Sequence, residues 1–213
     1  MKVSALVSTY NSSAYLAGCL EDLIRQTLYQ KGLLEIIVID SGSKENEGEM
    51  VRLFQKKYIN IKYLRTENRE SLYAAWNLGI QAADGSYLCN ANTDDRHEED
   101  CLEKLSDALD KDEKISLVYG NIKKVSSLKP SEKSEKKTAC PSQDFFPASL
   151  FFHYPYGPQP MWRAEIHSKV GYFDSKYEVL GDHEFALRLV KNGFSSAYVP
   201  EANGEMLWHS GAL

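Results

Sequence analysis

Residues 34–40 read LEIIVID, an almost unbroken apolar run that ends in an aspartate. Continuous runs of this kind are typical of strands covered on both faces, because strands with one solvated face alternate apolar and polar residues. A shorter run rich in β-branched residues, KVSALVS at 2–8, precedes it. Between the two runs, 12–28 has apolar residues at three- and four-residue spacing, which predicts a helix. The order strand, helix, strand predicts a parallel pair with a right-handed crossover.

The same alternation continues through the first half of the chain. We expect helices over about 45–57, 71–83 and 100–110, and strands at 61–65, 86–90 and 114–120. This pattern predicts an α/β fold with a mostly parallel central sheet flanked by helices. Ligands of such sheets bind beyond the carboxyl ends of the strands. Polar clusters follow three of the expected strands, at 9–11, 40–43 and 92–96, so we expect the site there.

The pattern changes after Asn121. The Lys-rich segment 123–137 predicts a solvated, flexible loop, or alternatively a flap that orders over a bound ligand. Aromatic and proline residues then fill 144–162, which indicates an irregular segment. The last expected elements are a helix over about 181–191 and strands at 195–201 and 204–210.

Bulk composition limits the class of protein. The 213 residues fit one domain, and 25 basic against 30 acidic residues argue against a nucleic-acid binder. The four cysteines form no CxxC pair, which predicts free thiols in a reducing, cytoplasmic setting. No apolar stretch approaches the roughly 20 residues of a membrane span. The sequence is compatible with peripheral attachment at the inner face of a membrane. It does not define the oligomeric state.

The stretch LCNANTDDRHEED, residues 88–100, contains the adjacent pair Asp94 and Asp95. Neighbouring carboxylates repel each other, so a fold that holds them together needs a cation or another compensating group. Two interpretations explain the pair equally well from the local sequence. The pair is a metal site, or it is an acidic helix start that complements the helix dipole.

Several segments in this order resemble the family 2 glycosyltransferases of the GT-A fold. They are VSTYN, IIVIDSGSKE, SLYAAWNLGIQAADGSYL, NTDD, VGYFD and GDHEFALRL, between about Val3 and Trp208. The resemblance implies an inverting enzyme that moves a sugar from a nucleotide diphosphate to an acceptor hydroxyl with Mn²⁺ or Mg²⁺. It also implies a single GT-A domain over 1–213. Its nucleotide-sugar-binding half would be 1–121, and 122–213 would hold the flexible loop, the acceptor subregion and the catalytic base.

By this resemblance, Asp94 and Asp95 occupy the DXD-like metal position, and the location after a strand favours the metal interpretation. Asp95 is the expected direct ligand, and Asp94 supports the metal or the donor ribose. Many relatives carry an aspartate where this chain has Asn92, whose amide still offers hydrogen bonds. His209, a lone histidine late in the chain, is a candidate for the metal or the diphosphate, or is structural.

The nucleotide contacts expected from the resemblance follow the first two strands. Thr9, Tyr10 and Asn11 lie where the family's base and ribose contacts cluster, and Asp40 matches its base-reading acid. The alternative is turn chemistry, which we favour for Ser41-Gly42. Arg69 is a candidate for phosphate contact, or a solvated surface arginine.

The catalytic base expected from the resemblance is Asp182 in GDHEFALRL, which is followed six residues later by Arg188. Gly181 replaces the glutamate that usually precedes this acid, and Glu184 is a candidate helper. The alternative makes Asp182 a helix N-cap and Glu184 a first-turn acid. Trp162 offers a flat face for an acceptor sugar, or belongs to the core.

The donor expected from Asp40 is a UDP-sugar, with dTDP and GDP donors left open. The acceptor would be a glycan or a lipid-linked molecule in surface polysaccharide or glycoconjugate synthesis. A nucleotidyltransferase or a Rossmann dehydrogenase would need a glycine-rich loop after the first strand, where this chain has STYNSSAY. The remaining rival is a catalytically silent carbohydrate- or nucleotide-binding domain. The departures at Asn92 and Gly181 keep this alternative open, and the retained Asp40, Asp94, Asp95 and Asp182 argue against it.

Overall fold

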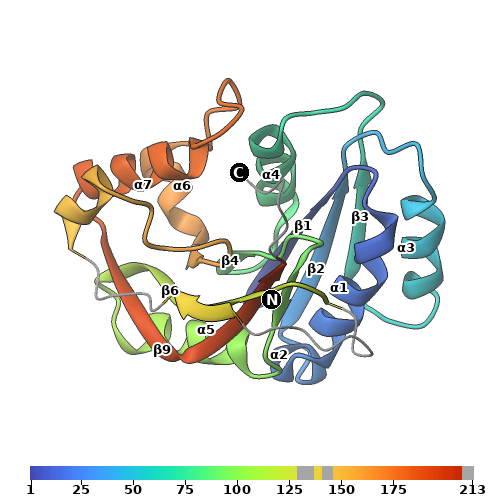
Figure 1. The fold of residues 1–213 in the computed structure, drawn as a ribbon, viewed down its shortest axis with the longest axis horizontal. Coiled ribbons are helices and arrows are strands. Elements are labelled where there is room, and N and C mark those ends of the chain that lie inside the picture. Colours follow the sequence, from blue (N-terminus) through green and yellow to red (C-terminus); the bar gives the residue numbers. More distant parts are fainter. Residues whose placement is uncertain (129–136, 141–145, 208–213) are drawn as a thin grey trace.

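The computed structural model of the chain describes residues 1–128, 137–140 and 146–207. The first half contains β1 (Val3–Thr9), α1 (Ser13–Arg25), α2 (Thr27–Gln30), β2 (Leu34–Asp40), α3 (Glu47–Gln55), β3 (Ile61–Arg65), α4 (Leu72–Ala82) and β4 (Tyr87–Asn90) (Figure 1). The second half contains β5 (Asp95–His97), α5 (Cys101–Lys111), β6 (Ile115–Val125), β7 (Lys137–Cys140), η1 (Pro147–Phe151), β8 (Met161–Arg163), η2 (Ala164–Ile166), α6 (His167–Val170), α7 (Gly181–Lys191) and β9 (Ser195–Leu207).

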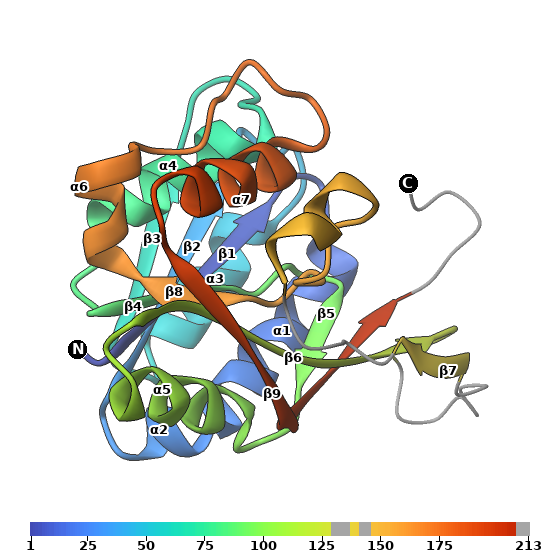
Figure 2. The ribbon, with the colours of Figure 1, turned by 90° about the vertical axis from the view of Figure 1, so that its left-hand side faces the viewer.

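Within the described ranges the strands form one sheet in the order β3-β2-β1-β4-β8-β6-β9-β5, with β7 paired to β6. The strands β3, β2, β1 and β4 are parallel neighbours, as the sequence predicted. β8 runs antiparallel between β4 and β6, and β9 runs parallel to β6 and antiparallel to β5. Figure 2 shows β9 as a long strand that crosses the second half of the molecule. The α/β fold with a central sheet is therefore confirmed, and its antiparallel pairs lie beyond β4.

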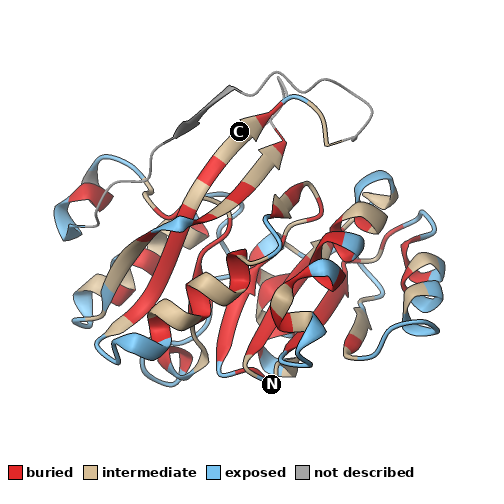
Figure 3. Ribbon diagram, turned by 90° about the horizontal axis from the view of Figure 1, so that it is seen from below, coloured by how far each residue is buried: buried red, intermediate tan, exposed pale blue. Residues whose placement is uncertain are grey.

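Two apolar clusters lie on opposite faces of the sheet, and β2 contributes to both. Ile36 and Val38 belong to the cluster under α1, α2, α3 and α5, whereas Ile37 and Ile39 belong to the cluster with α4 and α7. All seven residues of β2 are buried. Figure 3 shows that the buried, red parts of the ribbon gather in the strands at the centre of the molecule. The continuous apolar run at 34–40 thus has the physical cause expected of it, a strand covered on both faces.

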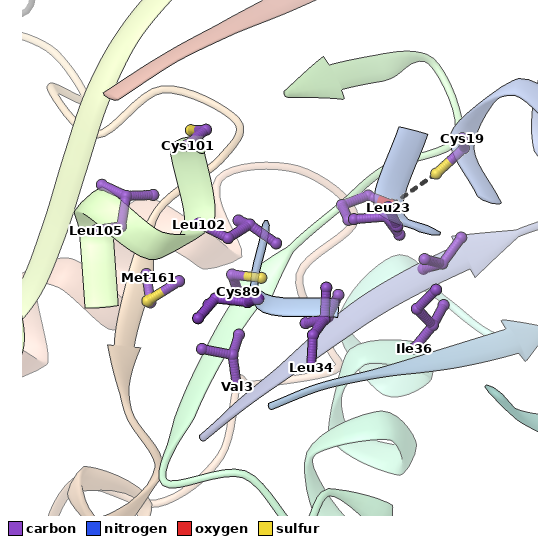
Figure 4. Packing of buried hydrophobic residues seen from close by; sticks show 14 of the residues in the cluster. Val3, Cys19, Leu23, Leu34, Ile36, Cys89, Cys101, Leu102, Leu105 and Met161 are labelled. Carbon is purple, nitrogen blue, oxygen red and sulfur yellow. Dashed lines mark hydrogen bonds between the residues drawn. The ribbon is translucent and has the colours of Figure 1, made fainter. Parts of the chain in front are cut away.

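Three cysteines pack into the first cluster (Figure 4). Cys19, Cys89 and Cys101 are buried free thiols. Burial raises the pKa of all three, that of Cys101 to about 12, so they remain protonated at neutral pH. They serve as small apolar side chains in the core.

Three predicted boundaries in the second half were wrong. β6 runs to Val125, past the expected end at 120, because Ile122 and Val125 are buried and the strand continues beside β9. The segment 137–140, which begins at the last residue of the expected loop, is the strand β7. The two strands expected at 195–201 and 204–210 form one strand, β9.

The described part of the chain contains no helix that is both long and apolar enough to cross a membrane. Most of the expected flap, 129–136, lies outside the described residues, so a flap there stays a prediction.

Candidate functional site

A cavity of about 490 Å³ opens beyond the carboxyl ends of β1, β2 and β4, beside the start of α4. Its wall includes five of the residues that the sequence singled out, namely Thr9, Tyr10, Arg69, Asn92 and Asp94. The strand register explains their proximity, because Thr9 pairs with Asp40 across the parallel β1–β2 ladder and Leu6 pairs with Asn90 in β4. Parallel strands that end together bring the loops after them to one edge of the sheet.

A row of hydroxyl groups joins the β1 end of the cavity to the aspartate loop. The Oγ atoms of Thr9 and Ser12 are 2.7 Å apart, and Thr93 Oγ1 donates to Ser12 Oγ at 3.3 Å. Ser12 occupies the N-cap of α1 without capping it by its side chain, since its hydroxyl takes part in this row. Sequence reasoning missed Ser12 and Thr93, because small hydroxyl residues are expected in loops whatever their role.

Arg69 lies over the ring of Tyr10, with its guanidinium carbon 4.4 Å from the ring centroid. Both residues belong to the cavity wall, so the pair offers an aromatic face and a positive charge to one ligand. Ser41, which the sequence assigned to a turn, also belongs to this wall, and its Oγ accepts a hydrogen bond from Glu70 N at 2.6 Å. Gly42 takes the turn conformation, with φ of +67°.

Asn11, Asp40 and Asp95 are not part of this wall among the described residues. Asn11 has a positive φ of 47°, and its Oδ1 accepts a hydrogen bond from Lys44 N at 2.8 Å. It therefore joins the loop after β1 to the loop after β2, which is the turn role that the sequence left as an alternative.

Asp40 is fully buried, and its carboxylate already has several partners. Oδ1 accepts from Ser43 N at 2.8 Å, and Oδ2 accepts from Tyr63 Oη at 2.5 Å and from Arg65. Burial by itself would raise the pKa of Asp40, but the hydrogen bonds and the charge of Arg65 outweigh it and lower this pKa. In this arrangement Asp40 holds β2 to β3, and the base-reading role that the resemblance implied stays a prediction.

The two neighbouring aspartates have different surroundings. Asp94 is half-buried in the cavity wall, whereas Asp95 is 2% exposed at the start of β5 and accepts a hydrogen bond from Asn92 Nδ2 at 3.1 Å. The sequence favoured Asp95 as the ligand, but adjacent residues at a strand start point to opposite sides, and here Asp94 faces the cavity. Burial, and then the charge of Asp94, raise the pKa of Asp95 well above its usual range.

This donor set fits a divalent cation of the Mn²⁺ or Mg²⁺ kind. Asp94 and Asn92 place a carboxylate and an amide in the cavity wall. Asp95 is buried next to them with a raised pKa, and a nearby cation would stabilise its charged form. Within 1–128, 137–140 and 146–207, no three His, Cys, Asp or Glu side chains converge as a closed metal cluster. The protein would therefore hold such a cation together with phosphate oxygens of a ligand. His209 lies outside the described residues.

Asp182 lies in the first turn of α7 and lines a second, narrow cavity together with Asn90 and Trp162. Its Oδ1 accepts hydrogen bonds from Tyr73 Oη at 3.3 Å and from His183 N at 2.9 Å. Tyr73 belongs to α4, whose neighbouring residues Leu72 and Ala75 line the first cavity. The first turn of α4 therefore connects the two cavities.

Glu184 and Trp162 have structural partners. Glu184 accepts from Arg188 Nε at 2.6 Å, and the same guanidinium donates to the backbone oxygens of Val170 and Tyr172. Trp162 is 1% exposed, and its Nε1 donates to His167 Nε2 at 2.9 Å. Trp162 thus lies in the core, which is the second of the two interpretations that the sequence allowed, and it does not offer an open face to an acceptor sugar.

The structure defines an α/β domain with a nucleotide-sized cavity at the carboxyl ends of parallel strands and an aspartate in its wall. The chain matches the family described as "Glycosyl transferase family 2" over residues 4–172. It belongs to that family, as its motifs suggested.

Sequence relatives carry related descriptions. Glycosyltransferase GlyG of Streptococcus pneumoniae serotype 4 is 34% identical over 119 residues, which cover 56% of this chain and 38% of the relative. A poly(ribitol-phosphate) beta-glucosyltransferase of Bacillus spizizenii is 27% identical over 167 residues, which cover 78% of this chain and 26% of the relative. The chain thus spans less than half the length of these two relatives.

Solved structures share the fold. S. aureus TarS 1–349 in complex with UDP has a TM-score of 0.78 at 19% identity, covering 98% of this chain and 61% of that one. The complex of the same protein with UDP-GlcNAc has a TM-score of 0.79 at 19% identity, covering 100% and 60%. This likeness establishes the GT-A fold of the chain.

Proposed function

We propose that this chain is the catalytic domain of a metal-dependent inverting glycosyltransferase that uses a nucleotide-diphosphate sugar, with a UDP-sugar as the favoured donor. The observation that carries the proposal is the cavity of about 490 Å³, in whose wall Thr9, Tyr10, Arg69, Asn92 and Asp94 converge from separate loops. UDP is favoured because TarS, which shares the fold, binds UDP and UDP-GlcNAc.

In this proposal different residues of the cavity wall bind different parts of the donor. Tyr10 and Thr9 contact the nucleoside, and Arg69, which lies over Tyr10, adds a positive charge to the same wall near the diphosphate. Asp94, with Asp95 beside it, would hold the cation, which neutralises the negative charge that develops on the leaving diphosphate. Fixed charges aimed at developing charge are among the largest contributions to enzyme rates.

The acceptor side of the proposal rests on Asp182. An inverting displacement needs a group that takes the proton of the acceptor hydroxyl, and a carboxylate serves as such a base. Asp182 lies across the first turn of α4 from the donor cavity, in the motif that resembles the family's base segment. The poly(ribitol-phosphate) beta-glucosyltransferase relative supports a surface glycopolymer, glycan or lipid-linked, as the acceptor class.

A thermal-shift panel tests the donor and the cation together. The protein is heated with UDP, GDP, dTDP or CMP, each with and without Mn²⁺. A ligand at about a hundred times its dissociation constant stabilises the folded state by roughly 2.7 kcal/mol. For a domain of this size that corresponds to a rise in Tm of roughly 5–10 °C. We expect this rise with UDP, and only when Mn²⁺ is present.

Two variants make the panel specific. Asp94→Asn should remove the Mn²⁺-dependent part of the rise, while Glu113→Gln, which removes the same charge from an exposed position outside the cavity, should keep it. A rise that is the same in Asp94→Asn and in the unaltered protein would contradict the cation site. Binding of a nucleotide diphosphate without any transfer or hydrolysis would favour the silent binding domain instead.

A further inference from the structure

Tyr73 lies between the donor cavity and the proposed base. It follows the N-cap of α4, where Ser71 Oγ accepts a hydrogen bond from Ala74 N at 3.3 Å. Its ring is 4% exposed and packs edge-on against Trp76, with centroids 5.4 Å apart, and in a stacked arrangement against Phe173 at 5.9 Å. These contacts fix the ring, and therefore the direction of its hydroxyl group.

The ring of Tyr73 occupies the space beside Gly181. A Cβ atom on Gly181 would lie 2.6 Å from Cε2 and 2.7 Å from Cδ2 of Tyr73, closer than real Cβ contacts occur. A side chain at position 181 and the observed position of the Tyr73 ring therefore exclude each other. Gly181 is the position where the resemblance leads one to expect a glutamate, so its replacement and the placement of Tyr73 form one structural feature.

The hydroxyl group of Tyr73 is directed to the carboxylate of the next residue. Tyr73 Oη donates to Asp182 Oδ1 at 3.3 Å. Burial, and then the negative charge of Asp182, raise the pKa of Tyr73, so the phenol remains protonated and a donor at neutral pH. A donor held in a fixed direction restricts the orientation of the carboxylate that accepts from it.

We propose that Tyr73 is a positioning residue for the proposed base: its hydroxyl, held in the space that Gly181 leaves, orients the Asp182 carboxylate. This inference rests on the assignment of Asp182 as the base. This chain has Gly181 where the resemblance implies a glutamate, so no side chain at position 181 can contact Asp182. The inference gives that supporting role to Tyr73 of α4.

Other titratable groups surround Asp182. Tyr154, which precedes β8, lies close enough for the Asp182 charge to contribute to the raised pKa of its phenol, after burial as the main cause. His183, next in the chain, directs its Nε2 to Leu150 O at 2.7 Å. Glu184 is paired with Arg188. Among these groups Tyr73 is the one whose side chain donates to the carboxylate, so its hydroxyl is the group to remove.

The direct test is the ¹³C NMR signal of the Asp182 carboxyl at one fixed pH, assigned through Asp182→Asn, in the unaltered protein and in Tyr73→Phe. We expect this signal to move in Tyr73→Phe, because the carboxylate loses a donor while the ring stays in place. Tyr87→Phe is the matched control, since Tyr87 Oη donates to Asp110 Oδ1 at 2.6 Å outside both cavity walls. It should leave the Asp182 signal unchanged. An unchanged Asp182 signal in Tyr73→Phe would overturn the proposal.

A kinetic test separates this inference from the proposed function. Release of UDP from the UDP-sugar is measured with Mn²⁺ present. Tyr73→Phe should lower kcat about 10-fold with KM for the donor unchanged. Full activity in Asp182→Asn would reject the base assignment and the inference with it. An inactive Asp182→Asn, together with an unchanged kcat in Tyr73→Phe, would reject the role of Tyr73 alone.

Discussion

In the first half of the sheet, β3, β2, β1 and β4 run parallel and their carboxyl ends meet at one edge, where the donor cavity lies. In the second half the strands run in mixed directions, and Asp182 comes from the start of α7. Backbone topology alone brings the polar loops of the first half together. Asp182 is instead placed by packing, in which the Tyr73 ring fills the space beside Gly181.

This difference separates two kinds of sensitivity. A site built by topology keeps its shape when one side chain is exchanged, because each loop is held by its own strand. A site built by packing moves when a neighbouring ring moves, because interiors are packed densely and transmit displacements. Exchanges in the first half should therefore change ligand binding, and exchanges around Asp182 should change turnover.

The largest expected effect belongs to the packed region. Asp182→Asn removes the proposed base and should lower turnover about 10²- to 10⁴-fold, the usual contribution of general acid–base catalysis. The Mn²⁺-dependent rise in Tm with UDP should remain, because Asp182 is not part of the donor cavity wall within the described ranges. The two readouts are UDP release and the thermal shift. Asp174→Asn, at an exposed position before α7, is the control and should change neither. Loss of nucleotide binding in Asp182→Asn would contradict the division of the molecule into a region for ligand binding and a region for turnover.

The next effect concerns stability in the topological region. Asp40→Asn weakens the charged hydrogen bonds to Tyr63 and Arg65 and should cost about 2 kcal/mol of unfolding free energy, or roughly 4–8 °C in Tm. The pKa of Asp40 is lowered in the folded state, so its stabilisation is present above the pKa of the unfolded chain, about 3.9, and is lost as the pH falls below that value. The difference in Tm between variant and parent should therefore shrink in acid.

Asp40→Asn also decides between two roles for this residue. If Asp40 holds β2 to β3, the variant keeps its thermal response to UDP and Mn²⁺ at a lower starting Tm. If it reads the nucleobase, that response disappears or changes between UDP and the other nucleotides. The buried position and the existing partners of the carboxylate favour the first outcome.

Sequence reasoning was accurate where a residue's position depends on its own strand. The apolar runs at 2–8 and 34–40 located β1 and β2, and the polar residues after them predicted the edge at which the cavity lies. The helix expected over 71–83 located α4, which Ser71 caps, because capping depends on the local chain. Such features follow from periodicity and turn chemistry within a few residues.

It was less accurate where partners come from distant parts of the chain. The burial of Trp162 depends on a β8 that pairs between β4 and β6, and no local pattern encodes that insertion. The places of Asp94 in the cavity wall and of Asp95 in the interior depend on the pairing of β5 with β9, and which of the two binds a metal directly stays a prediction. The predicted strand ended at 120, because polar residues dominate the segment that follows. Its buried residues Ile122 and Val125 are part of β6, which continues beside the partner strand β9.

The smallest expected effect is that of Arg69→Leu, which tests how far the topological region tolerates exchange. The Arg69 guanidinium lies 4.4 Å from the Tyr10 centroid, and a cation–π contact at a partly exposed site contributes about 0.5–1 kcal/mol. Losing it should lower the Tm of the free protein by roughly 1–4 °C. The cavity wall also loses a positive charge, which should weaken UDP binding roughly 2- to 5-fold by titration calorimetry. Arg25→Leu, at an exposed arginine in the last turn of α1, is the control for the loss of charge. A weakening well above 10-fold would mean that Arg69 itself binds the diphosphate, since hydrogen bonds to charged groups contribute about 1.5–3 kcal/mol. Equal affinity for UDP in Arg69→Leu and Arg25→Leu would mean that Arg69 is a solvated surface arginine. Binding of the donor would then depend on the residues at the strand ends alone.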